Sequence, residues 1–274
     1  MKFRFLGTAA AEGIPSIFCD CEACRRSWKA GGRSLRTRSQ AIVNDDLLID
    51  FPPDTFSHLL TYGIDIIKAN HCLITHVHTD HYYPVEFNYL HKGYAAPPDG
   101  YEFHVYGSED VVNQAEQFVP KASGHLFPHK LERFVPEKIG RYTVTAMPAD
   151  HGTPNPNIYL ISDGEKTLLY GHDTGIFKEE VWEYLQKMKV RLDLVTMDCT
   201  GAAMDDLPYS THMCLGRDVK VRDRLLSVGT ADNSTIFIAN HFSHNGLYAA
   251  YEDFRPLAAA VGFETSYDGM TVEI

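Results

Sequence analysis

The sequence predicts a layered α/β protein built around a pair of β-sheets. Three observations lead to this expectation: short apolar or alternating segments bounded by turn residues, amphipathic segments interspersed among them, and ample apolar material. Hydrophobic residues make up 44% of the 274 residues and aromatic residues 12%, which is ordinary for a compact protein. Strands and helices mixed in this way pack in layers, because each must bury its apolar face against another element.

The expected strands are short, apolar or alternating, and bounded by Gly, Pro, Asp or Asn. They span residues 2–7, 40–43, 46–51, 72–75, 103–107, 141–147, 157–162, 166–170, 193–197 and 234–239. Turn residues at Asn44-Asp45 and Asp163-Gly164 predict hairpins at those positions.

The expected helices span residues 53–62, 109–116, 178–189, 213–227 and 247–260. The third carries Val181, Trp182, Leu185 and Met188 on one stripe, which indicates a surface helix that packs inward. Residues 91–103 and 119–140 are rich in Pro, Gly, His and Tyr. Both are expected to be long loops or a lid.

The charge balance excludes one class of partner. The chain carries 25 Lys and Arg against 36 Asp and Glu, a formal net charge of −11. This argues against broad, sequence-independent binding of nucleic acid, which depends on basic patches. One basic cluster remains, at Arg25, Arg26, Lys29, Arg33, Arg36 and Arg38. It is interpreted as a solvated face, with attraction of an anionic substrate as the functional alternative.

The sequence also bears on the compartment. No stretch is long and apolar enough to span a bilayer, so no membrane partner is expected. The first residues, 1–7, lack the apolar run of a signal peptide. The protein is therefore expected to be cytoplasmic. In a reducing compartment the close cysteine cluster at 19–24 suggests metal before disulfide.

The segment His76-Val77-His78-Thr79-Asp80-His81 brings three histidines and a carboxylate together after an apolar strand. His76 and His78 are two residues apart, and in an extended chain that spacing points both imidazoles to one side. Such a set can supply ligands for one or two borderline metal ions. A solvated loop with chance histidines is the plainer alternative, but a buried strand that opens onto the turn is the context a metal site needs.

The pattern His-x-His-x-Asp-His resembles the hallmark of the metallo-β-lactamase superfamily. Three later segments also match, in order: Asp150-His151, His172-Asp173-Thr174 and Asn240-His241. Each follows an expected strand, so all could converge on one edge of the sheets. The resemblance implies the metallo-β-lactamase fold, a four-layer αββα sandwich, with residues 1–274 as a single hydrolase domain.

This resemblance implies a site for two metals. One metal would be held by His76, His78 and His151, the second by Asp80, His81 and His241, with Asp173 as the bridge. Asp80 and Asp173 would thereby take part in catalysis. An aspartate at the bridge, where the antibiotic-degrading members carry cysteine, points to ester and phosphodiester hydrolases. Two such metals would lower the pKa of a shared water from about 15.7 toward about 7, which supplies hydroxide at neutral pH.

A second motif, Cys19-Asp20-Cys21-Glu22-Ala23-Cys24, places three thiols close together. Three thiolates need a fourth ligand to complete a tetrahedral structural zinc site. The residues alone leave His244, Cys214 and Cys199 as candidates. Three free cysteines on a loop are the simpler alternative.

A narrower resemblance spans nearly the whole chain and is strongest at a few islands. These are residues 7–15 with the cysteine motif, residues 197–200, the His212 region, residues 241–244 and residues 267–270. They look like the phosphodiesterase family of the carbon–phosphorus lyase pathway. This resemblance implies that the three cysteines share a structural zinc with His244, that His212 is the catalytic proton donor, and that the chain forms a homodimer.

The chain departs from that family in three places. Tyr82-Tyr83-Pro84 is bulky where small residues are usual, His172 stands where Ser is usual, and the stretch 85–103 is longer. These positions lie where a substrate would sit, so the resemblance leaves the substrate open. Asp50 and Asp198, which end two strands, either orient ligand imidazoles or are buried turn carboxylates.

The sequence therefore predicts a metal-dependent phosphodiesterase that hydrolyses a small or cyclic phosphodiester with a two-metal-activated hydroxide. The alternatives are a carboxylic ester, lactone or thioester hydrolase of the same fold, a transfer-RNA 3′-end nuclease, and a non-enzymatic metal-binding module. The nuclease is disfavoured because no Gly-rich basic insertion is found, and a module would not need a bridging aspartate. His and Asp ligands suit zinc and manganese equally in the active site.

Overall fold

A computed structural model describes residues 1–274 as two β-sheets packed face to face. The first sheet runs in the order β14 (Thr271–Glu273), β1 (Lys2–Gly7), β2 (Gln40–Val43), β3 (Leu47–Ile49), β4 (His71–Leu73), β5 (Phe103–Gly107) and β6 (Leu126–Lys130). The second runs β13 (Glu264–Thr265), β12 (Ile236–Asn240), β11 (Leu194–Asp198), β10 (Thr167–Gly171), β9 (Asn157–Ser162), β8 (Tyr142–Pro148) and β7 (Pro136–Ile139).

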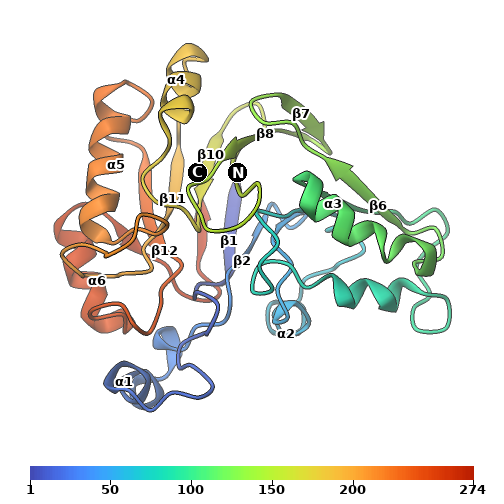
Figure 1. The fold of residues 1–274 in the computed structure, drawn as a ribbon, viewed down its shortest axis with the longest axis horizontal. Helices are drawn as coiled ribbons and strands as arrows, with labels where there is room; N and C mark the ends of the chain where they lie inside the picture. The colour runs from blue at the N-terminus through green and yellow to red at the C-terminus, as the bar shows by residue number, and fades with distance from the viewer.

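Helices cover the outer faces of both sheets (Figure 1). On the second sheet lie α4 (Glu179–Lys187), α5 (Leu215–Ser227) and α6 (Tyr251–Ala260). On the first lie α2 (Thr55–Tyr62), α3 (Glu109–Glu116) and the 3₁₀ segments η2 (Pro84–Leu90) and η3 (Val119–Lys121). A further helix, α1 (Glu22–Ala30), with the 3₁₀ turn η1 (Gly32–Ser34), projects from one end of the molecule. The predicted four-layer αββα sandwich is confirmed.

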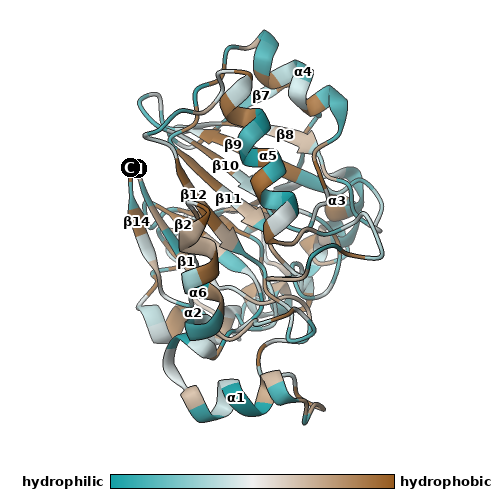
Figure 2. Cartoon of the chain, turned by 90° about the vertical axis from the view of Figure 1, so that its left-hand side faces the viewer, coloured by the Kyte–Doolittle hydropathy of each residue, from teal (hydrophilic) through white to brown (hydrophobic).

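Three apolar clusters fill the spaces between the layers. The cluster between the sheets includes Phe3, Phe5 and Tyr170, all fully buried. The cluster beneath α4, α5 and α6 contains Trp182, and the remaining cluster lies beneath α2 and α3. Apolar strand residues accordingly lie inside and polar helix faces outside (Figure 2). Burial of this apolar surface is the main favourable contribution to the folding free energy.

The turn residues of the sequence connect antiparallel strands at both expected positions. β2 pairs antiparallel with β3 across Asn44 and Asp45, which both have positive φ angles. β9 pairs antiparallel with β10 across a turn that includes Gly164 at φ 97°. Both hairpin predictions are confirmed. No helix of the chain is long and apolar enough to cross a membrane.

The expectation of a long loop over residues 119–140 is wrong. This stretch contains η3 and the strands β6 and β7. Both strands are the outermost members of their sheets, and each carries a proline, Pro128 and Pro136. An edge strand has one side without ladder partners, so a residue without an N–H is tolerated there. Because of these prolines, the sequence pattern indicated loops where the structure has strands.

Other element boundaries also differ from the predictions. The last predicted helix, 247–260, begins only at Tyr251, because Tyr248 has a φ of 58° and the segment before the helix is a turn. Met188 ends its helix and is 51% exposed, so it leaves the buried stripe of α4. The helix α1 and the short strands β13 and β14 were not predicted.

Candidate metal centre

Seven side chains meet at one edge of the two sheets, and we call them the histidine edge. The turn after β4 supplies His76, His78, Asp80 and His81, and the segments after β8, β10 and β12 supply His151, Asp173 and His241. They form two groups, His76–His78–His151–Asp173 and Asp80–His81–Asp173–His241. Within each group the potential ligand atoms lie within 4.8 Å of one another. The structure thus brings these predicted residues together, and their roles as metal ligands remain a prediction.

Asp173 is the member common to both groups. Its Oδ2 atom lies 2.9 Å from His81 Nε2 and 3.2 Å from His76 Nε2. Its Oδ1 atom lies 3.4 Å from His241 Nε2, and this buried oxygen accepts no hydrogen bond. The residue has a φ of 50°, in the left-handed region that non-glycine residues seldom adopt. Strain of this kind persists where the surroundings impose it, commonly at functional sites.

The donor atoms fit divalent cations. His76 Nε2 lies 3.0 Å from His78 Nδ1, and His81 Nε2 lies 3.2 Å from His241 Nε2. Imidazole nitrogens that face one another this closely need a proton or a cation between them. Neutral imidazole and carboxylate are ligands of zinc and other borderline metals. An orphaned buried oxygen on Asp173, in the middle of these nitrogens, supports the same interpretation.

Burial and the central carboxylates push the pKa values of these groups apart. Burial lowers the pKa of His76 to about 4, which favours the neutral form that can ligate a metal. Burial also acts to lower the pKa of His81, but Asp50 and Asp173 outweigh it and raise that pKa well above its usual value. Burial would raise the pKa of Asp173, but His241 and His81 hold it well below the usual range. Asp173 is therefore ionised.

The rear nitrogens of two imidazoles of the histidine edge, those of His81 and His241, contact fully buried carboxylates. Asp50 Oδ2 accepts from His81 Nδ1 at 2.7 Å, and its Oδ1 accepts from the backbone N–H and the hydroxyl of Thr75 at 2.8 Å. Asp198 Oδ2 lies 3.4 Å from His241 Nδ1. Such contacts fix the orientation of a ring whose other nitrogen faces the centre. The two roles weighed for Asp50, ring orientation and turn stabilisation, are thus both present.

His212 stands beside this centre. Its Nδ1 lies 2.9 Å from Asp198 Oδ2 and 3.3 Å from Asp173 Oδ1. Burial acts to lower the pKa of His212, but the carboxylate of Asp198 outweighs it and raises the pKa to about 9. The same atoms, with His241, form a further group within 4.8 Å. His212 can therefore act either as a proton donor backed by Asp198 or as a ligand.

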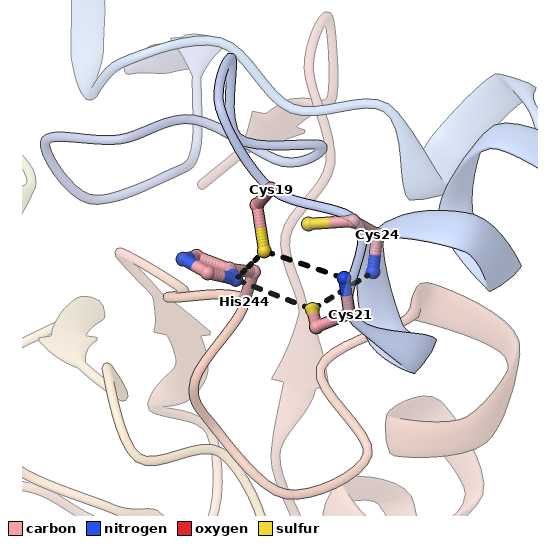
Figure 3. Close-up of side chains that lie close together, drawn as sticks. All are labelled: Cys19, Cys21, Cys24 and His244. Carbon is pink, nitrogen blue, oxygen red and sulfur yellow. Dashed lines mark hydrogen bonds between the residues drawn. The ribbon is translucent and has the colours of Figure 1, made fainter.

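A separate group of potential ligands, which we call the cysteine knuckle, consists of Cys19, Cys21, Cys24 and His244 (Figure 3). His244 Nδ1 is 3.5 Å from Cys19 Sγ and 3.4 Å from Cys21 Sγ. Cys21 caps α1, and its sulfur accepts from the backbone N–H of Cys24. Burial would raise the pKa of Cys21, but the contact with His244 and the hydrogen bonds with Cys24 and Cys19 together outweigh it and lower the pKa to about 6.

Of the three candidates for a fourth ligand, only His244 lies beside the three cysteines. The four side chains come from the N-terminal loop, the first turn of α1 and the loop after β12, which lie side by side in Figure 3. Their potential ligand atoms are mutually within 4.8 Å. Cys199 and Cys214 are buried free thiols outside this group. Three sulfurs and one imidazole nitrogen suit a closed tetrahedral zinc site.

The sequence profile described as the beta-lactamase superfamily domain matches residues 47–227, which is more than half of the chain. The chain belongs to the beta-lactamase superfamily. The matched residues include the turn after β4 and the positions of His151, Asp173 and His212. No protein with a curated description matches the sequence.

Solved structures share the superfamily fold at low sequence identity. Zn²⁺-bound PqqB from Methylobacterium extorquens is 17% identical, with a TM-score of 0.75 over 100% of both chains. A diphosphatase from the PhnP family is 20% identical, with a TM-score of 0.76 over 100% of this chain and 97% of the other. Human tRNase Z, short form, is 14% identical, with a TM-score of 0.64 over 100% and 99%. These likenesses show the fold alone.

Two residues that contact these groups, Thr200 and Glu12, were not among the predicted site residues. Thr200 Oγ1 lies 3.0 Å from His241 Nδ1 and 3.2 Å from His212 Nδ1, so it links the two rings. Glu12 Oε1 lies 3.7 Å from His244 Nε2 and also accepts from the hydroxyl of Ser243. Both Thr200 and Glu12 fall within segments that carried the family resemblance. Their positions, although not their partners, could have been found.

Proposed function

We propose that this protein is a metal-dependent hydrolase that cleaves a small or cyclic phosphodiester. The observation that carries the proposal is Asp173, which contacts histidines of both donor groups and also His212. Two divalent cations at these groups would supply hydroxide at neutral pH and a positive field for charge that develops on phosphoryl oxygens. A diphosphatase among the proteins of this fold is consistent with phosphate chemistry.

The residues of the histidine edge would hold the cations, and buried carboxylates would orient their rings. His76, His78 and His151 would hold one cation, Asp80, His81 and His241 the other, and Asp173 both. Asp50 holds the ring of His81 from behind at 2.7 Å. Asp198 contacts the rings of both His241 and His212 through one carboxylate oxygen. Rigid ring positions matter because a preorganised site loses little free energy to rearrangement during the reaction.

His212 is proposed as the proton donor to the leaving oxygen. All hydrogen bonds of its imidazole ring use Nδ1, which leaves Nε2 available to a substrate. Asp198 stabilises the protonated ring, and only a protonated ring can donate from Nε2 while Nδ1–H donates to Asp198. A general acid in this position typically contributes about 10²–10⁴-fold in rate.

A substrate panel tests the proposal. Protein purified without chelator should hydrolyse glycerol 1,2-cyclic phosphate or a nucleoside 2′,3′-cyclic phosphate faster than a lactone or a thioester. Faster turnover of the lactone or thioester would replace this function with that of a carboxylic ester hydrolase. His212→Ala should retain its metals and lose about 10²–10⁴-fold in rate on the cyclic phosphate. Loss of a metal ion instead would make His212 a ligand.

A further inference from the structure

The segment that carries His212 has no regular backbone structure, and the side chain of Arg217 bonds to four of its residues. Residues 205–214 contain neither helix nor strand. Arg217, in the first turn of α5, donates to the carbonyl oxygens of Leu207, Tyr209 and His212, at 2.9, 2.7 and 2.9 Å. Its Nε atom also donates to the carboxylate of Asp206 at 2.7 Å. A single guanidinium therefore supplies the donors that a helix or a strand would otherwise provide.

The opposite side of this segment rests on the histidine edge. The carbonyl oxygen of Thr211 lies 3.4 Å from His151 Nδ1. The carbonyl oxygen of Ser210 packs against Gly175, where a Cβ atom would approach it to 1.7 Å. Only glycine fits that approach, so the backbone of the segment lies directly on the loop after β10. The segment is thus enclosed between the metal-ligand loops and Arg217.

The shape of the guanidinium explains why an arginine is present. Its planar fork directs several N–H groups at fixed angles, and here they reach three carbonyls and one carboxylate. A lysine ammonium is a compact charge that cannot reach all of these acceptors together. The Arg217 side chain is only 13% exposed, so water would compete weakly for its bonds to the half-buried carbonyls of Leu207 and His212. Without it, the three carbonyls would lose their partner and the segment could move.

We propose that Arg217 is a positioning residue that fixes segment 206–212 so that Nε2 of His212 meets the leaving oxygen of the substrate. Arg217 touches neither substrate nor metal; it acts through His212. This inference rests on the proposed role of His212 as proton donor. A displacement of about 1 Å in a reacting group can cost about 10²-fold in rate, so a loosened segment would be measurable.

The experiment compares Arg217→Met and Arg217→Lys with a matched control on the same helix. Arg224→Met removes a guanidinium that pairs with the exposed Glu179 and covers Trp182, outside the site. Each variant is assayed on glycerol 1,2-cyclic phosphate, whose leaving group is an alkoxide, and on methyl p-nitrophenyl phosphate, whose leaving group needs little protonation. Metal content is measured in parallel.

The expected pattern is specific to a positioning role. In Arg217→Met, kcat on the cyclic phosphate should fall about 10–100-fold with little change in KM, while the nitrophenyl ester loses less than about 3-fold. Arg217→Lys should lie between Met and the parent, and Arg224→Met should match the parent. Adding Arg217→Met to His212→Ala should cause little further loss, because both changes remove the same function.

An NMR measurement tests the role of Arg217 separately from the proposed function. The ring resonance of His212, assigned by its absence in His212→Ala, should shift and broaden in Arg217→Met but not in Arg224→Met. An unchanged resonance, or an equal loss of rate on both substrates, overturns the role of Arg217. If the parent protein cleaves neither phosphodiester, the proposed function fails and the positioning role fails with it. If the parent cleaves both and only the Arg217 pattern is absent, the proposed function stands alone.

Discussion

The histidine edge and the cysteine knuckle are both groups of potential ligands, but they differ in what holds the side chains in place. At the histidine edge the residues follow strand ends, and most are buried. Carboxylates behind the rings, such as Asp50, hold His81 independently of any ion. The knuckle instead lies at a projecting end of the molecule (Figure 1), where its cysteines bond mainly to one another and to His244.

This difference separates two uses of a metal. At the histidine edge the sheets and buried carboxylates build the site, so an ion is added to an existing framework. In the knuckle an ion would itself join residues 19–24 to the loop after β12, whereas the earlier part of the N-terminal loop already meets that loop through Ala9 and Phe242. Ile17, Phe18 and Trp28 near the knuckle are 73%, 99% and 69% exposed. Loss of metal should therefore cost activity at the first site and structure at the second.

The largest effect is expected from Asp173→Ala. This change removes the only charge shared by both donor groups, so two metals should be lost and the knuckle zinc retained. Activity should fall on the order of 10³-fold or more, because the hydroxide source depends on those metals. The fold should persist, because the strands hold the loops. Elemental analysis measures the metal content, kinetics the activity and a melting curve the stability. Asp205→Ala, at an exposed position, is the control. Parental metal content in Asp173→Ala would contradict the shared-ligand role.

A smaller effect is expected from Asp50→Asn. The side chain keeps its size, but it can no longer offer two charged oxygens to His81 and Thr75. Metal affinity at the histidine edge should weaken about 10–100-fold, the usual cost of altering the partner of a ligand imidazole. Competition with a chromogenic chelator measures this change. Asp54→Asn, on the same loop but paired with Arg38, should bind like the parent. Equal affinity in Asp50→Asn would show that the strands alone orient the ring.

A change in the cysteine knuckle, by contrast, should mainly lower the stability of the fold. Cys21→Ser removes one sulfur of the group, so one zinc per chain should be lost and the melting temperature should fall by roughly 5–10 °C. A loss of a few kcal/mol shifts the melting temperature of a chain of this size by that amount. Metal binding at the histidine edge should weaken too, because His244 follows His241 by three residues. Cys214→Ala, which removes a buried thiol outside the group, should keep its zinc. A parental melting curve with parental metal content in Cys21→Ser would rule out the structural role of this cysteine.

Much of the histidine edge could be predicted because each member follows a strand with a clear pattern. β4, β8, β10 and β12 alternate or run apolar and stop at a turn, so their C-terminal ends could be placed on one edge. Asp198 could be found for the same reason, at the end of β11. Local sequence carries this information because strand length and side-chain alternation are local properties.

The features that were not predicted depend on tertiary contacts, which leave no pattern in the local sequence. Arg217 bonds to backbone carbonyls, and any residue can supply a carbonyl. The strands β6 and β7 carry prolines that suggest loops, and only their places at the sheet edges make those prolines acceptable. The helix α1 is short and projects from the body, so it lacks the apolar stripe of a packed helix. These features are set by tertiary position.

The smallest effect concerns Asp218, a buried carboxylate that contrasts with Asp50. Both side chains are fully buried, but Asp50 accepts three hydrogen bonds, whereas neither oxygen of Asp218 has a partner. The thiol of Cys199 lies beside Asp218 but donates to the carbonyl of Ala202. Burial accordingly raises the pKa of Asp218 well above its usual value. If hydrogen-bonded carboxylates are what order the histidine edge, Asp218 should be dispensable to it.

The pH dependence of stability tests this last point. A raised pKa in the folded state means that the folded protein keeps a proton that the unfolded chain releases. The stabilising contribution of protonated Asp218 is complete below the unfolded pKa near 3.8 and is lost as the pH rises toward the folded pKa. Asp218→Asn removes this loss, so its melting temperature should exceed that of the parent by about 2–4 °C at pH 7, with a smaller difference at pH 4. Metal content and kcat should match the parent. A stability difference that does not grow with pH would mean that Asp218 is ionised in the folded state, and its burial would then need a partner that the hydrogen bonds do not provide.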